Sequence, residues 1–278
     1  MIIARITPFV LLSYLLLVAA TCEEKLDVGP TAEDLTIEKR EQLGDLLAQT
    51  VISRPDLFPL LNRSSKSDTL VLNYLQTMYN QVTRQLRRRS SSRGERWTLT
   101  RPWQTYVLDA PEPVAYSLPG GHFFISTGFL ETLEHGHELY YLMAFEAIHV
   151  SEAYLADELI GAFGTAPLLQ LLKKDEPQPN ELTLLELAEH LRFDMNLEDD
   201  IVREIDRKTA PLICETSIFA RLGIRSILEK LEQSSVEQYR QSRPSYQNRL
   251  AFIDGLPVDD CGSVKSTGLY WELVRKNL

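Results

Sequence analysis

The chain has 278 residues, of which 44% are hydrophobic and 24% are charged, and these ordinary globular values exclude wholesale disorder, a collagen-like repeat and a multispanning membrane protein. Its formal net charge of −10, from 29 basic and 39 acidic residues, argues against nucleic acid as a partner, because nucleic-acid binding usually requires a basic surplus. Three cysteines are too few for a disulfide scaffold. We expect one compact domain with short extensions.

Residues 1–21 have the pattern of an export signal peptide. Arg5 supplies a positive charge, an apolar run extends from Ile6 to Ala20, and small residues precede Cys22. A membrane span needs about 20 apolar residues, so an uncleaved anchor is the less favoured alternative. The Ala-Ala-Thr-Cys ending resembles a bacterial lipobox, which implies an acylated Cys22; ordinary cleavage after Ala20 stays open. We therefore expect an exported protein of the bacterial periplasm or cell envelope, anchored to a membrane through lipidated Cys22.

The next part of the chain is predicted to be helical. Residues 22–65 are expected to form a polar tether and a short helix, and apolar residues at helical spacing then predict an amphipathic helix over 68–88. The stretch 87–94, rich in arginine and serine, is predicted to be a loop. Its basic patch has two interpretations: contact with anionic lipid headgroups or an acidic partner, and a solvated helix end with favourably placed cations, which we favour. The basic residues are Arg84, Arg87, Arg88, Arg89, Arg93, Arg96 and Arg101.

Three short extended segments follow, at Thr105–Leu108, Val114–Leu118 and Phe123–Ser126. The turn Pro119-Gly120-Gly121 joins the second segment to the third. Together they predict a small antiparallel sheet. From Leu130 the pattern is helical for about 100 residues, so the predicted fold class is α+β and mostly helical.

The region around this sheet carries a family resemblance. Residues 115–131 run Ala-Tyr-Ser-Leu-Pro-Gly-Gly-His-Phe-Phe-Ile-Ser-Thr-Gly-Phe-Leu-Glu, and residues 144–150 run Ala-Phe-Glu-Ala-Ile-His-Val. This order of strand, double-glycine turn and helix resembles the zinc metallopeptidase family that contains the heat-shock protease HtpX, the CAAX prenyl proteases and the BepA-type periplasmic proteases. The resemblance implies a metallopeptidase-like domain over residues 66–256, most specifically over 105–150, and leaves 257–278 as a C-terminal extension.

In that family a His-Glu-x-x-His helix supplies two zinc ligands and a general base, because residues four apart lie on one face of a helix. Here Phe145 occupies the first ligand position. Glu146 keeps the position of the general base, and His149 keeps that of the second ligand.

The third family ligand is a glutamate four residues before the aspartate of a later Glu-x-x-Ala-Asp motif. The resemblance aligns Glu204 and Asp206 with the end of that motif, which brings Val202 to the ligand position. Glu198, one helical turn earlier, is a candidate for a shifted carboxylate ligand. Two of the three expected metal ligands are thus apolar.

A late segment resembles the family's His-Pro-x-x-x-x-Arg-Ile element. It keeps Arg249 but carries Arg243 where relatives have a histidine near the metal, and a guanidinium there is unfavourable for zinc. Catalytic zinc usually has three protein ligands, so we expect zinc to be absent or weakly bound and hydrolysis to be impaired. Without a metal, a buried Glu146 needs either a partner or a raised pKa, and we expect Arg207, Arg243 or Arg249 to pair with it.

The family binds an extended polypeptide by adding it to the strand that corresponds to Val114–Leu118, and such binding requires no zinc. The implied binding residues are those of the strand and the turn: Val114, Ala115, Tyr116, Ser117, Leu118, Gly120 and Gly121. The predicted function is therefore polypeptide binding in envelope quality control, with a client protein or an active relative as partner. The alternatives are an active zinc endopeptidase with unusual ligands and a structural lipoprotein with a vestigial groove.

Two questions about the cysteines stay open at this point. In an oxidising compartment Cys214 and Cys261 can form a disulfide if Cys22 carries lipid. Two unpaired cysteines are an equal alternative, because spacing alone does not set the geometry of a bridge.

Overall fold

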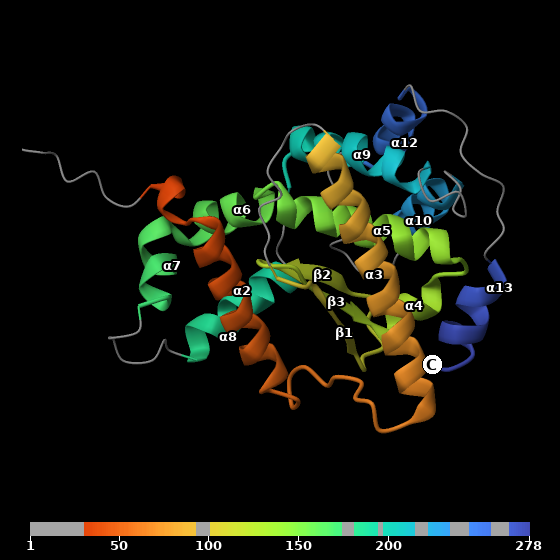
Figure 1. Cartoon of the computed structure of the whole chain (residues 1–278), viewed down its shortest axis with the longest axis horizontal. Coiled ribbons are helices and arrows are strands. Elements are labelled where there is room, and N and C mark those ends of the chain that lie inside the picture. The colour runs from red at the N-terminus through yellow and green to blue at the C-terminus, as the bar shows by residue number, and fades with distance from the viewer. Residues whose placement is uncertain are drawn as a thin grey trace, which may run out of the picture.

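The structure, a computed structural model, describes residues 31–92, 101–173, 181–193, 197–214, 222–233, 245–256 and 267–278. Its elements follow in the order η1 (Ala32–Asp34), α2 (Ile37–Ile52), α3 (Lys66–Ser92), β1 (Gln104–Leu108), β2 (Ala115–Leu118), β3 (His122–Ser126), α4 (Thr127–Thr132), α5 (Gly136–Ser151), α6 (Tyr154–Phe163), α7 (Thr165–Leu171), α8 (Glu181–Phe193), α9 (Asp199–Cys214), α10 (Leu222–Glu232), α12 (Tyr246–Asp254), α13 (Thr267–Tyr270) and the π-helical turn η2 (Trp271–Arg275). The fold is α+β and mostly helical, which confirms the predicted class (Figure 1).

The three strands form one mixed sheet in the order β1-β3-β2. β2 and β3 are antiparallel, as their connection through the double-glycine turn predicted. β1 is parallel to β3, so the prediction of a purely antiparallel sheet was wrong. The reason is that β2 does not pair with β1 directly. The chain leaves a gap between these two strands, and β3 then fills the gap and pairs with both.

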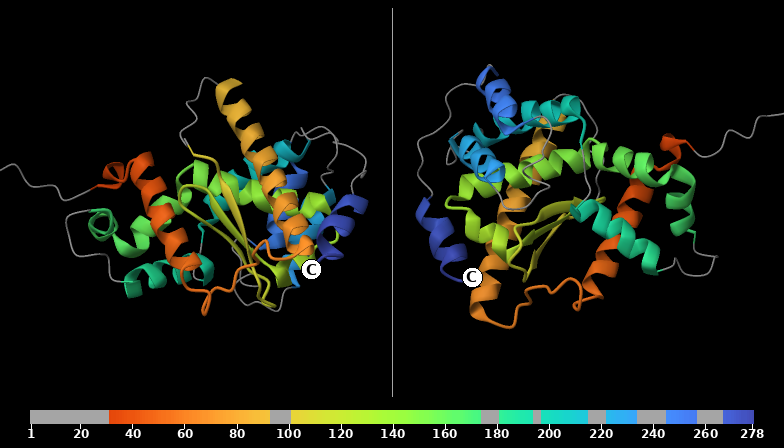
Figure 2. Two further views of the ribbon diagram at one scale, coloured as in Figure 1. Left: turned by 60° about the horizontal axis from the view of Figure 1, so that its bottom comes forward. Right: turned by 180° about the vertical axis from the view of Figure 1, so that it is seen from behind.

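Helices cover both faces of the sheet (Figure 2). On one face, Tyr79 of α3 packs against Phe123 of β3 with ring centroids 5.4 Å apart, and α5 lies beside α3. On the other face, Tyr106, Phe124 and Tyr116 form a stack of rings across the sheet, with centroids 4.6 and 5.2 Å apart. The helices α2 and α8 pack together on this second side. The sheet is therefore enclosed between two helical layers.

The helix α3 follows the predicted periodicity, because its buried residues Val71, Leu75, Met78, Val82 and Leu86 recur every three or four positions. It extends further than predicted and includes residues 87–92, which we expected to be a loop. Arginine is a good helix former, and no glycine or proline interrupts this stretch before residue 94. The described part of the basic stretch is thus helical.

The N-terminal segment belongs to the same core as the sheet. Leu43 and Leu47 of α2 are fully buried, and Gly44 lies so close to the β2–β3 turn that a Cβ there would stand 1.6 Å from the carbonyl oxygen of Pro119. Gly121 of the turn has a φ of +90°, and a Cβ on it would meet the Trp103 ring at 2.4 Å. The boundary that we drew at residue 65 therefore does not separate two packing units.

The C-terminal segment also packs against the core. Tyr270 is fully buried and donates a hydrogen bond from its hydroxyl to the carbonyl of Leu130, at 2.8 Å. Cys214 is disulfide-bonded, whereas Cys22 and Cys261 lie outside the described residues. Residues 1–21 lie outside them as well, and none of the described helices is long and apolar enough to cross a membrane.

Candidate functional site

The helix α5 places Glu146 and His149 in the interior. Almost every residue of this helix is buried, because it is enclosed by α3, α9 and α10 as well as by the sheet. Glu146 is 7% exposed and His149 is completely buried. They are three residues apart on α5, so both side chains leave the same side of the helix.

These two residues belong to a buried polar cluster, which also includes Tyr79 of α3 and Ser117 of β2. Among the described residues, no hydrogen-bond partner is found for the Tyr79 hydroxyl, the Ser117 hydroxyl, Oε2 of Glu146 or either ring nitrogen of His149. Buried polar atoms are normally hydrogen-bonded, so this cluster is a candidate for a functional site. Other buried side chains, such as His137, also lack a partner among the described residues.

Burial determines the ionisation of both residues on α5. It raises the pKa of Glu146 to about 7, and the negative charge of Glu158 adds to this shift. The polar groups of Ser117 lie near the carboxyl and oppose the shift, although the Ser117 hydroxyl is not within hydrogen-bond geometry of it. Burial lowers the pKa of His149 to about 3. His149 is therefore neutral near pH 7, and Glu146 is poised between its two protonation states. Such perturbed groups are typical of functional sites, although buried structural groups show them too.

Glu158 of α6 is a member of the cluster that sequence reasoning missed. Its Oε2 lies 3.8 Å from Nε2 of His149. Ala153, which has a φ of +68°, lies between α5 and α6, and α6 then places Glu158 beside the end of α5. No sequence signal marked this contact, because the bend depends on a left-handed alanine that spacing and composition do not reveal.

The two positions that lack a ligand in the sequence are filled by apolar packing. The half-buried ring of Phe145 lies 4.9 Å from the guanidinium carbon of Arg249, and 6.3 Å from the ring of Tyr141. Val202 of α9 is buried, at 4% exposure. Within the described ranges, no three histidine, cysteine, aspartate or glutamate side chains are grouped so that they could hold a metal ion. The residues present do not fit the zinc site that the resemblance implies.

Asp206 and Arg249 form the principal buried ion pair beside Phe145. Nε and Nη2 of Arg249 donate to Oδ2 and Oδ1 of Asp206 at 2.9 and 2.8 Å, and the Tyr141 hydroxyl donates to the same carboxylate at 2.5 Å. Arg249 is held by Asp206, so among the three arginines expected as partners of Glu146 it is not the one that pairs with it. Both residues had been singled out by the resemblance, in two separate motifs.

The other expected partners and ligands lie elsewhere. Arg207 donates to Glu204 at 2.7 and 2.5 Å on the outside of α9, so it does not pair with Glu146 either. Glu198 is exposed, just before α9 begins, and it joins no potential metal-binding group among the described residues. Arg243 and Cys22 lie outside the described ranges.

The strand and turn that we expected to bind a polypeptide are covered. Tyr116, Ser117 and Leu118 of β2 are 2%, 0% and 0% exposed, and α8 packs against this strand. Val114 is likewise buried, and Ala115 is half-buried. The side chains of Tyr116, Ser117 and Leu118 are therefore inaccessible in the observed arrangement.

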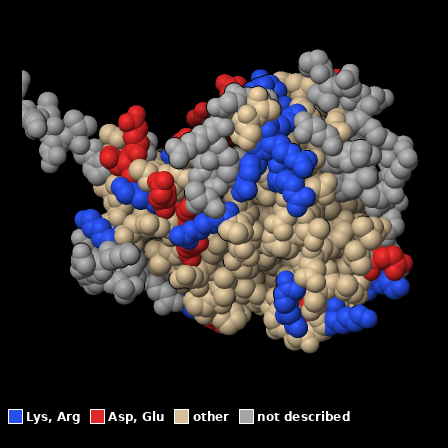
Figure 3. All heavy atoms as spheres, in the orientation of Figure 1, with Lys and Arg blue, Asp and Glu red and all other residues tan. Residues whose placement is uncertain are grey.

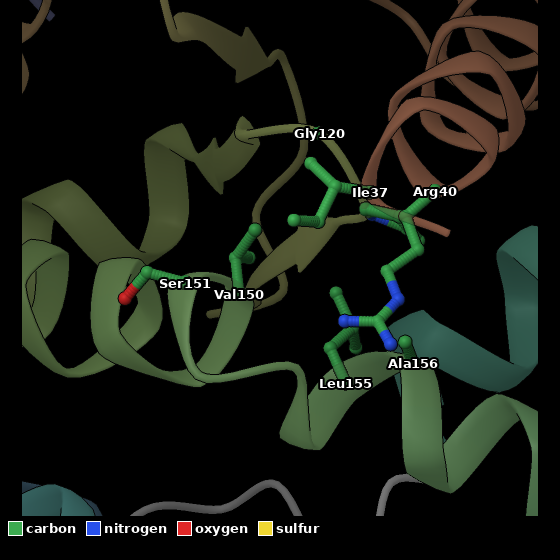
Figure 4. A pocket seen from close by; sticks show the side chains of 8 residues that line it. Ile37, Arg40, Gly120, Val150, Ser151, Leu155 and Ala156 are labelled. Carbon is green, nitrogen blue, oxygen red and sulfur yellow. The ribbon is translucent and has the colours of Figure 1, made fainter. Parts of the chain in front are cut away.

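The double-glycine turn is similarly enclosed. A cavity beside Gly120 has a volume of only about 20 Å³, enough for about one water molecule. Figure 4 shows that Arg40 reaches over Leu155 and Ala156 in this cavity, while the Ser151 hydroxyl points away from it. A polypeptide has no room here in the observed arrangement.

The basic patch lies on the C-terminal part of α3. Arg84, Arg87 and Arg88 are exposed there, and Figure 3 shows lysine and arginine side chains gathered over this end of the helix. Arg101 differs, because it forms ion pairs with Asp45 and Glu41 of α2. The patch is thus a helix end, and its two interpretations remain predictions.

No protein-family model matches the chain, and no curated protein matches it.

Proposed function

We propose that this chain is a metallopeptidase-like protein of the bacterial cell envelope that binds polypeptides and has lost zinc-dependent hydrolysis. Its partner would be a client protein or an active relative. The proposal rests on the family resemblance together with the chemistry of the buried cluster, in which a general-base position and one ligand position keep their residues and the other ligand positions do not.

One observation carries the proposal. At the first ligand position, Phe145 has its ring against the guanidinium of Arg249, which is held in place by Asp206. A divalent cation at this point would face an apolar ring and a fixed positive charge in a buried environment, and both are unfavourable. Glu146 therefore has no metal-activated water on which to act as a base.

The proposed location rests on the sequence. Residues 1–21 have the pattern of a signal peptide, and Cys22 follows a sequence that resembles a lipobox. A lipid on Cys22 would hold the domain at a membrane surface through the tether. Detection of an acyl-modified N-terminal peptide by mass spectrometry tests this, and a free Cys22 thiol at the mature N-terminus would contradict it.

The experiment for the binding function uses the purified mature chain and an unfolded probe, reduced and carboxymethylated lactalbumin. We expect saturable binding without cleavage, both with added zinc and with a chelator. The matched control is Glu146→Gln, which should bind equally well because no catalytic base is used. Cleavage that the chelator and Glu146→Gln both abolish would refute the proposal, and so would the absence of any binding.

A second candidate is an active zinc endopeptidase with unusual ligands, and one observation favours it. Both ring nitrogens of buried His149 lack partners among the described residues, and a carboxylate oxygen of Glu158 lies 3.8 Å from Nε2. Elemental analysis separates the candidates: stoichiometric zinc that His149→Ala removes would favour the enzyme. Phe145→His combined with Val202→Glu tests the alignment, because gained zinc binding would show that these positions face the same point as His149.

A further inference from the structure

The outer edge of β1 is only partly paired. Leu61 donates its backbone N–H to the carbonyl of Val107 at 2.9 Å, so the connection between α2 and α3 begins an antiparallel pair with this strand. The pairing consists of a single bridge, Leu60 opposite Leu108. The connection then leaves the sheet and passes to α3 (Figure 1). Most of β1 is left without a second strand.

Alternation along β1 shows which backbone groups face this edge. Gln104 donates to Gly121 and so faces β3, which means that Thr105 and Val107 face outward. The Thr105 N–H donates to Oε1 of Gln76, at 3.0 Å. The Thr105 carbonyl and the Val107 N–H have no hydrogen-bond partner in the part of the chain that the structure describes. The side-chain amide of Gln76 thus replaces one hydrogen bond that a neighbouring strand would make. The Thr105 carbonyl and the Val107 N–H remain available to such a strand.

A groove runs along these outward-facing groups. Its volume is about 260 Å³, and it is bounded by β1, by the connection after α2 and by α3. This is more than ten times the volume of the cavity beside Gly120. Leu60, Leu61 and Leu72 supply apolar walls. The groove therefore offers both backbone partners and space for an apolar side chain, which β2 does not.

The charge of the groove indicates what kind of segment it suits. Arg63 is the charged residue in its lining, and no carboxylate lines it. Nη1 of exposed Arg63 donates to Oδ1 of Asn73 at 2.6 Å, which leaves the other N–H groups of the guanidinium for a ligand. Among the described residues, Arg63 has no acidic partner. A carboxylate is the complement that an arginine prefers.

We infer that the outer edge of β1 binds an extended polypeptide segment with aliphatic and carboxylate side chains, which continues the sheet where residues 59–61 leave it. The segment would pair with the Thr105 carbonyl and the Val107 N–H, displace the Gln76 amide from Thr105, and place a carboxylate on Arg63. This inference rests on the proposed polypeptide-binding function and moves the binding edge from β2 to the opposite side of the sheet.

The experiment uses the mature chain and a fluorescent peptide that alternates valine and glutamate. We expect saturable binding, and we expect the same peptide with alternate backbone nitrogens methylated to lose it, because it cannot pair as a strand. Arg63→Glu should weaken binding at least about tenfold, because it replaces a charge-assisted contact by repulsion. Arg203→Glu, the same change at an exposed position of α9, is the matched control and should leave binding unchanged.

Hydrogen exchange maps the site independently of these variants. Bound peptide should protect residues 104–108 and leave 115–118 unchanged. Protection of 115–118 alone, equal binding of the methylated peptide, or unaltered affinity of Arg63→Glu would overturn the inference. The proposed function would survive each of these if unfolded lactalbumin still bound. A concentration-dependent dimer that protects 104–108 without peptide would show that a second copy occupies the edge, and this also would overturn the inference.

Discussion

Asp206 and Arg249 are 43 residues apart in the sequence and form a two-point buried ion pair, with nitrogen–oxygen distances of 2.8 and 2.9 Å. The pair joins α9 to α12, and the Tyr141 hydroxyl ties it to α5. Because the Arg249 side chain also lies over Phe145, this network lies beside the position at which the family resemblance implies the first zinc ligand. It links the packing of three helices to the chemistry of the candidate site.

Asp206→Asn should therefore be strongly destabilising. Removal of one partner leaves Arg249 as a buried unpaired charge, which usually lowers the free energy of unfolding by about 3–5 kcal/mol. Urea denaturation measures this change. The control is Glu204→Gln, which breaks an exposed pair with Arg207 and should cost no more than about 1 kcal/mol. Equal effects of the two substitutions would show that the buried pair is not important for stability.

Glu146→Gln should change how stability depends on pH. The pKa of Glu146 is raised to about 7 in the folded protein, from 4.5 in the unfolded chain. Its contribution is fully present below pH 4.5 and is lost as the pH rises to 7, because the unfolded chain releases the proton first. Relative to the variant, the natural protein should lose stability across this range, by an amount of the order of 3 kcal/mol. Parallel curves of unfolding free energy against pH would contradict the burial of this carboxyl group.

Three buried histidines should make the protein sensitive to acid. Burial lowers the pKa of His149 to about 3, and burial with nearby positive charge lowers those of His122 and His137 to about 4. Their contribution is present above pH 6.5 and is lost as the pH falls toward these values, because only the unfolded chain takes up the protons. Near pH 5 these three histidines should therefore bind about three protons in total when the chain unfolds. Glu146 releases a proton on unfolding and partly offsets this uptake.

His149→Gln tests how much His149 alone contributes to this proton uptake. The slope of unfolding free energy against pH between 4.5 and 6 should fall by the equivalent of about one proton, because glutamine does not titrate. His122→Gln is the companion variant and should produce a similar decrease. An unchanged slope in His149→Gln would mean that His149 is protonated in the folded state and has a partner there.

Gly44→Ala tests the close approach of α2 to the β2–β3 turn. Alanine normally stabilises a helix relative to glycine by about 1 kcal/mol, but a Cβ at this position would stand 1.6 Å from the Pro119 carbonyl oxygen. We expect a loss of more than about 2 kcal/mol, because the clash is with backbone atoms of a packed core. Gly161→Ala in α6 is the matched control. A Cβ at position 161 would meet no atom within 4 Å. Gly161→Ala should therefore leave the melting temperature unchanged or raise it, and thermal denaturation of both variants measures the difference.

Local signals in the sequence were sufficient for most elements. The spacing of apolar residues predicted α3, and the glycine pair predicted the hairpin of β2 and β3, because these patterns act over a few residues. The helical spacing of Glu146 and His149 likewise predicted that they share one side of a helix. The prediction of a loop at the end of α3 was wrong for residues 87–92, because arginine and serine occur in helices as well as in loops.

The arrangement of distant segments was decided by tertiary packing. The sequence contained Asp206, Arg249 and Glu158, but only the folded chain brings Arg249 to Asp206 instead of Glu146, and Glu158 to His149. It also packs α8 against β2 and leaves most of the outer edge of β1 without a neighbouring strand. The physical reason is that such contacts depend on how whole helices and strands fill the space between them, and no short stretch of sequence contains that information.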